Sequence, residues 1–81
     1  MTRTRSQLAL SEAKAGRLYT VTEIRGGEEL RRRLADMGLG PGAVFSVEHN
    51  PGHGTLVAAV KGSRLVLGRG MVERIMVSVC I

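Results

Sequence analysis

The sequence predicts a small, mainly β domain: a barrel of five short strands, with one short α-helix between the first and second strands. Two patterns support this prediction. Five short runs alternate apolar and polar residues and are separated by Gly, Pro or Asn, which is typical of strands joined by turns. One further run repeats its apolar residues at helical spacing. A chain of 81 residues has room for one hydrophobic core. A few short strands cannot bury their apolar faces in an open flat sheet, whereas closing into a barrel buries these faces and removes the exposed edges.

The first strand is expected over residues 17–25, which are rich in β-branched and aromatic side chains. Tyr19 and Val21 alternate with threonines, so both are expected to face the core. The alternation slips at Glu23-Ile24, which indicates a bend or a β-bulge. Two glycines then end this strand.

The helix is expected over Glu28–Met37, with acidic residues in its first turn, where the helix dipole favours them. Gly38 is well placed to end it in the left-handed conformation, and Pro41 prevents it from resuming. Salt bridges at i, i+4 spacing are expected to support it, namely Glu28–Arg32, Glu29–Arg33 and Arg32–Asp36. The residues that shape the helix stripe and the following turn are Leu30, Leu34, Met37, Gly38, Pro41 and Gly42. The stripe is expected to seal one end of the barrel.

Four more strands are expected over residues 43–49, 55–61, 64–67 and 74–79. By alternation, their inward-facing residues are Phe45, Val47, Leu56, Ala58, Val60, Leu65, Leu67, Ile75, Val77 and Val79. Gly62-Ser63 suits a two-residue hairpin turn. Residues 68–72 are expected to be irregular, with one helical turn.

Catalytic patterns are missing from the sequence. The glycine-rich pieces lack the lysine and following hydroxyl residue of a phosphate-binding loop, and no parallel βαβ unit is available for a dinucleotide site. Tyr19 and Phe45 are the only aromatic residues, which argues against the stacking platforms that bind single-stranded RNA. The chain is therefore expected to be a binding module without a cofactor, and not an enzyme.

Two histidines are weak candidates for metal ligands. His49 and His53 are four residues apart but flank a Pro-Gly loop, and a remote Cys80 does not complete a zinc pattern. The alternatives are two loop histidines that face water, and a transition-metal-binding module. Cys80 is expected to be a small residue at a strand end.

The net charge of +5 is densest at Arg31-Arg32-Arg33, on the predicted helix. Three interpretations remain open for these arginines. They form a solvated helix face, a docking face for an acidic protein surface, or a contact for nucleic-acid phosphates. The scarcity of aromatic residues disfavours nucleic acid.

The polar residues 1–9 are expected to form a flexible tail, and residues 10–81 the domain. The N-terminus lacks the apolar stretch of a secretion signal, no run approaches the length of a membrane-spanning helix, and a single cysteine offers no disulfide. The expected location is the cytoplasm. Exposed strand edges of small barrels favour self-association, so a homo-oligomer is also considered.

The segment Leu30–Gly42, LRRRLADMGLGPG, resembles the hallmark of the FeoA family, an arginine-rich helix that ends in a Leu-x-Asp-Met/Leu-Gly-Leu/Ile-x-Pro-Gly turn. The flanks agree over most of residues 10–79, with a similar hairpin at 60–67 and closing strand at 75–77. Three places depart from the family pattern: Ala13 and Ala15, the Gly68-Arg69-Gly70 stretch, and the loop 50–54.

This resemblance implies an SH3-like barrel with a non-catalytic, regulatory role in bacterial ferrous iron uptake. Its implied partner is FeoB, the membrane Fe(II) transporter with a GTP-binding domain, which would hold the protein at the inner face of the cytoplasmic membrane. Similar barrels occur in iron-dependent repressors. On this hypothesis Arg31, Arg32 and Asp36 are exposed for a partner, and Leu39 is an apolar anchor.

Overall fold

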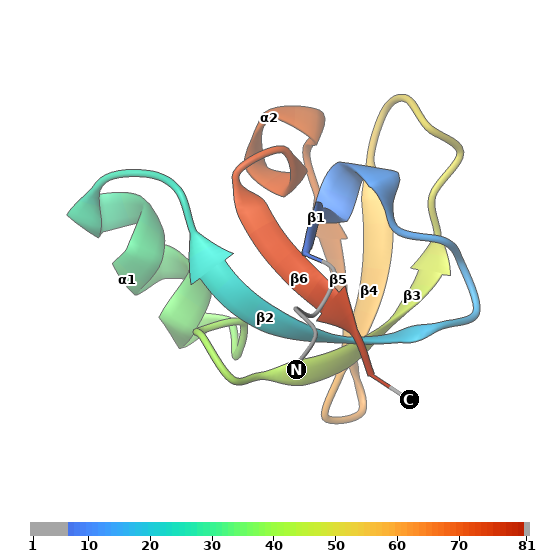
Figure 1. The fold of residues 1–81 in the computed structure, drawn as a ribbon, viewed down its shortest axis with the longest axis horizontal. Coiled ribbons are helices and arrows are strands. Elements are labelled where there is room, and N and C mark those ends of the chain that lie inside the picture. The colour runs from blue at the N-terminus through green and yellow to red at the C-terminus, as the bar shows by residue number, and fades with distance from the viewer. Residues whose placement is uncertain (1–6, 81) are drawn as a thin grey trace, which may run out of the picture.

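One antiparallel sheet carries the fold in the computed structural model, which describes residues 7–80 (Figure 1). Its strands follow the order β1-β6-β2-β3-β4-β5. The strands are β1 (Leu8–Ala9), β2 (Leu18–Ile24), β3 (Val44–His49), β4 (Leu56–Val60), β5 (Ser63–Leu67) and β6 (Ile75–Val79). The described residues also include three short helices: the 3-10 helix η1 (Leu10–Glu12), α1 (Glu28–Asp36) and α2 (Arg69–Val72).

The five predicted strands are confirmed as β2 to β6, and the predicted helix as α1. The additional strand, β1, lies where the sequence suggested a flexible tail. Leu8 pairs with Val77 and Ala9 with Met76, so these two residues belong to the sheet, and the proposed boundary at residue 10 is corrected. The remaining prediction, for residues 1–6, lies outside the described residues.

The expectation of a closed ring of strands is wrong. Within residues 7–80, no backbone pairing joins β5 to β1, and these two strands are the edges of the sheet. The sheet curls nevertheless, with register shifts after Val21 in β2 and after Val47 in β3. The helical segments complete the core that the open sheet does not enclose. Each contributes one fully buried side chain: Leu10 from η1, Leu34 from α1 and Val72 from α2. The result is a mainly β, SH3-like fold whose core is sealed by side chains at the open edges.

The alternation of residues along each strand predicts the core well. A single cluster gathers the inward-facing residues of β2 to β6, namely Tyr19, Val21, Ile24, Phe45, Val47, Leu56, Ala58, Val60, Leu67, Ile75 and Val77. Val79 is an exception with 40% exposure, and it is the last residue of β6. Leu65 is the other exception and stays half-buried, since β5 is an edge strand.

The hairpin between β4 and β5 turns one residue earlier than predicted. Val60 pairs with Ser63, so the two turn residues are Lys61 and Gly62 and not Gly62 and Ser63. Both turn residues have positive φ angles, 48° and 84°, as a type I′ turn requires. The right-handed twist of the two strands selects this turn, although lysine is an unusual residue for its first position.

The end of α1 is a Schellman motif, which confirms the left-handed conformation predicted for Gly38. The Gly38 amide donates to the Ala35 carbonyl oxygen at 3.0 Å, and the Leu39 amide donates to the Leu34 carbonyl oxygen at 2.8 Å. The φ angle of Gly38 is +87°. Leu34 and Leu39 are both fully buried, which is the apolar contact that accompanies this motif.

We predict that Gly38→Ala destabilises the domain by about 1–2 kcal/mol, because a side chain at positive φ is strained. A methyl group at this position would also lie 3.3 Å from Cγ1 of Val60. Gly40→Ala is the matched control: its methyl group would meet Ala35 at an ordinary 3.7 Å, and the expected change is under about 0.5 kcal/mol. Urea unfolding of both variants measures the difference, and equal midpoints would contradict the role of Gly38.

Candidate interaction surface

Helix α1 lies at one end of the sheet, beyond the end of β2, and projects away from the strands (Figure 1). Leu34 inserts fully into the core, while Leu30 and Met37 are partly buried against it. The predicted apolar stripe is therefore the attachment of α1 to the sheet. This attachment leaves the other face of the helix to solvent.

The solvent face of α1 carries three consecutive arginines, together with acidic residues at the two ends of the helix. Arg31, Arg32 and Arg33 are all exposed, and so is Asp36. The salt bridges predicted within this helix do not form. In the part of the chain that the structure describes, the ion pairs within 4.0 Å are Arg25–Glu23 and Arg64–Glu48. The three guanidinium groups thus keep their hydrogen-bond donors available for an acidic partner.

Leu39 does not join this surface, and the prediction of an exposed apolar anchor is corrected. Its side chain is fully buried because the Schellman motif directs it onto Leu34. Leu39 therefore holds the helix in place and cannot contact a partner in this conformation.

An apolar depression next to α1 could accept a partner's side chain instead. It has a volume of about 240 Å³ and is lined by Leu30 of α1, Gly70 and Met71 of α2, and Arg74. We name α1's exposed Arg31, Arg32, Arg33 and Asp36, together with this depression, the helix surface. Sequence patterns did not identify Met71 and Arg74, because their proximity to Leu30 arises only when the two helices pack at the same end of the sheet.

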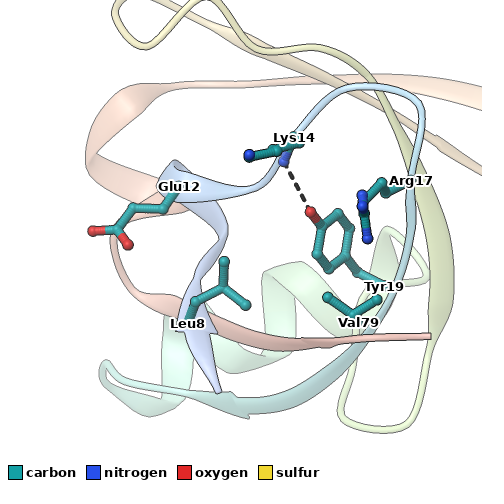
Figure 2. A pocket seen from close by; sticks show the side chains of 6 residues that line it. All are labelled: Leu8, Glu12, Lys14, Arg17, Tyr19 and Val79. Atoms are coloured by element: carbon teal, nitrogen blue, oxygen red, sulfur yellow. Dashed lines mark hydrogen bonds between the residues drawn. The ribbon is translucent and has the colours of Figure 1, made fainter. Parts of the chain in front are cut away.

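A second depression lies beside β1 and the end of β6 (Figure 2). It has a volume of about 260 Å³ and is lined by Leu8, Glu12, Lys14, Arg17, Tyr19 and Val79. The hydroxyl oxygen of Tyr19 accepts a hydrogen bond from the Lys14 amide at 2.9 Å. Figure 2 shows Arg17 beside the tyrosine ring and the carboxylate of Glu12 directed away from it. The lining combines apolar and charged groups but contains no nucleophile with an adjacent base.

The two histidines do not form part of a metal-binding cluster. His49 ends β3 and His53 lies in the following loop, and both are exposed. Within residues 7–80, no three His, Cys, Asp or Glu side chains come close enough together to hold a metal ion. Cys80 is half-buried beyond the end of β6, where its amide donates to the Leu18 carbonyl oxygen at 2.9 Å.

The loop that carries His53 is held by Asn50 and Arg69. The Asn50 amide nitrogen Nδ2 donates to the Ala13 carbonyl oxygen at 2.7 Å. Arg69 donates from Nη2 to Oδ1 of Asn50 and from Nε to the Gly54 carbonyl oxygen, both at 3.1 Å. The loop and Arg69 are two of the three places where the sequence departs from the family pattern, and the structure shows that they bind each other.

None of the helices among the described residues has the length and apolar character needed to cross a membrane. The longest, α1, has nine residues.

Comparison with known proteins places this architecture among iron-transport proteins. The family model of the FeoA domain matches residues 8–79. A Methanocaldococcus jannaschii protein named Fe(2+) transport protein A is 35% identical over 68 residues, which are 84% of this chain and 82% of that protein. The crystal structure of an iron uptake regulatory protein (FeoA) superposes with a TM-score of 0.86 at 35% identity, covering 93% of this chain and all of the other.

The same fold also occurs within a larger regulator. A manganese-dependent transcriptional repressor superposes with a TM-score of 0.83 at 20% identity, covering 96% of this chain but only 44% of the repressor. This likeness is one of fold alone. The resemblance implied similar barrels in iron-dependent repressors, whereas this repressor is named as manganese-dependent.

We predict that Arg69→Ala and Asn50→Ala each destabilise the domain by about 1–2 kcal/mol, because each removes hydrogen bonds that hold the loop. The double variant should lose less than the sum of the two, by at least about 0.5 kcal/mol, since the two side chains bond each other. Arg74→Ala, the loss of an exposed arginine, is the control and should change stability by less than about 0.5 kcal/mol. Thermal or urea unfolding measures all four, and simple additivity would refute the coupling.

Proposed function

The chain belongs to the FeoA family of Fe(2+) transport proteins, and from this premise we propose that it is a non-catalytic accessory protein that binds the cytoplasmic part of a FeoB-type transporter through the helix surface. The observation that carries the proposal is the run of three exposed arginines on α1. Arg31, Arg32 and Arg33 are all exposed, and no carboxylate of the described residues lies within 4.0 Å of their guanidinium groups, although Glu28, Glu29 and Asp36 are exposed on the same helix. A protein that keeps three adjacent guanidinium groups unpaired is suited to an acidic partner surface.

The depression between α1 and α2 supports the same assignment. Interfaces combine a desolvated apolar centre with a polar rim. Leu30 and Met71 would supply the centre, while Arg74 and the arginines of α1 would supply the rim. A single apolar side chain of the transporter domain fits a space of about 240 Å³.

The positive net charge would also attract the protein to the membrane surface that holds the transporter. The net charge of +5 favours approach to the anionic inner leaflet and to acidic surfaces on the transporter. Such steering acts on the association rate and weakens as salt increases. A peripheral, partner-dependent location at the inner face of the cytoplasmic membrane follows from this proposal.

Burial of the aromatic residues argues against nucleic acid as the ligand of the helix surface. Tyr19 and Phe45 are each 2% exposed, with ring centroids 6.2 Å apart in the core. Neither ring can therefore stack on a base. Phosphate contacts alone would give binding without sequence specificity.

We predict that Arg31→Glu/Arg32→Glu weakens binding to the purified cytoplasmic domain of the transporter at least tenfold, because like charges would then face its acidic surface. Titration calorimetry at low and at physiological salt measures the change, and circular dichroism checks that the variant is folded. The wild-type affinity should fall as salt rises, and the variant should lose most of this salt dependence.

The matched control is Lys14→Glu/Arg17→Glu, which makes the same change in net charge at the second depression. We expect this control to bind with nearly wild-type affinity. Loss of binding in the control but not in the α1 variant would move the docking site to the second depression. Equal affinity in all three proteins would remove both surfaces, and the proposal with them.

A further inference from the structure

We propose that the free edge of β5 binds the same edge of a second copy of this chain, so that two β5 strands pair antiparallel about Leu65 and join the two sheets. This surface is separate from the helix surface, and the proposal does not depend on the transporter. It rests on the backbone groups, exposure and charge of β5.

The outer edge of β5 presents unpaired backbone groups. Val60 and Ser63 flank the two-residue turn and form a hydrogen-bonded pair, and such pairs alternate with non-bonded ones along an antiparallel ladder. Arg64 and Val66, opposite Ala59 and Val57, therefore direct their N–H and C=O groups away from β4. No backbone group within residues 7–80 bonds to these four groups.

The usual protections of an edge strand are missing at β5. Natural edges are interrupted by bulges or proline, shortened, or lined with free charges. The ladder between β4 and β5 runs through five consecutive pairs without a register shift, unlike the ladder between β2 and β6 and the ladder between β3 and β4. The other edge strand, β1, has only two residues. The edge of β5 is thus the place where this sheet accepts another strand.

The side chains of β5 leave apolar surface that a second copy would cover. Among residues 7–80, Val66 is the most exposed large apolar residue, at 64%. Leu65 points inward but remains half-buried at the open edge of the core. In a pairing centred on Leu65, the two copies of this leucine would lie directly opposite each other and complete their mutual burial.

Charge selects a second copy over an acidic peptide. The guanidinium Nε of Arg64 lies 2.9 Å from Oε1 of Glu48 on the neighbouring part of the same sheet. Arg64 is therefore already paired although the chain carries a charge of +5, so an acidic strand gains little from it and a second copy meets no unpaired charge at this position. Arg64 of one copy would face Val66 of the other, and its aliphatic stem would lie over that valine.

Antiparallel pairing about Leu65 is self-complementary. Arg64 of each copy lies opposite Val66 of the other. The two resulting pairs are hydrogen-bonded pairs, with four N–H···O=C bonds in total. A two-fold axis through the leucine pair generates both. Because the interface is small, we expect a weak dimer with a dissociation constant on the order of 100 µM.

Sedimentation equilibrium of the full chain from about 10 µM to 1 mM tests this dimer. Val66→Pro removes an N–H that faces only the free edge and should weaken dimerisation at least tenfold. Val66→Thr, which keeps the N–H and the strand propensity, is the control and should stay within about threefold of the wild type. A wild type that is monomeric up to 1 mM, or a folded Val66→Pro variant that dimerises as well as the wild type, would overturn the proposal.

Amide hydrogen exchange on the wild-type protein keeps the test decisive if Val66→Pro does not fold. Exchange at Arg64 and Val66 should slow as the protein concentration rises, while the exposed loop amide of His53 should not change. Concentration-independent exchange at the two edge amides contradicts the dimer. Protection of these amides only when the transporter domain is added would assign the edge to that partner and likewise overturn self-pairing.

Discussion

The junction between α1 and β3 is the constraint on which the rest of the molecule depends. Gly38 adopts a left-handed conformation that stops the helix, and the two hydrogen bonds across it direct Leu34 and Leu39 into the core. Because the two leucines fix the rotation of α1 about its axis, the three consecutive arginines between Leu30 and Leu34 can only point to solvent. The same glycine therefore determines the packing at one end of the sheet and the chemistry of the surface outside it.

Local patterns in the sequence were sufficient for most of the fold. Alternation identified the inward faces of five strands, and helical spacing with a terminal glycine identified α1, because both signals come from residues close in the chain. Features that depend on distant contacts were less accessible. Leu39 was expected to be an apolar anchor for a partner, but the Schellman motif buries it. Leu8 and Ala9 were expected to lie in a tail, but they pair with β6. The candidate surface was likewise only half predictable: its arginines lie on one helix, whereas Met71 and Arg74 come from another.

The departures of this sequence from the family pattern compensate for each other. The loop after β3 has two positive-φ glycines, and such a loop loses much conformational entropy when it is ordered. Arg69 offsets part of this cost by binding Asn50 and the Gly54 carbonyl oxygen, and Asn50 in turn bonds to the segment after η1. The unusual loop and the unusual helix form one structural unit, which explains how the SH3-like fold is retained despite both changes.

The helix surface and the β5 edge use different physics, and this difference allows them to operate independently. Attraction through exposed guanidinium groups acts over about 8 Å at physiological salt and weakens as salt increases. Pairing of strand edges depends on backbone hydrogen bonds and on apolar contact, neither of which salt screens to the same degree. Because Glu48 neutralises Arg64, the edge contributes little to the electrostatic field that the arginines of α1 create. Ionic strength should therefore weaken the binding of an acidic partner. Self-association of two copies that each carry +5 should instead hold or strengthen as salt screens their repulsion, so that a single salt titration separates the two surfaces within one protein.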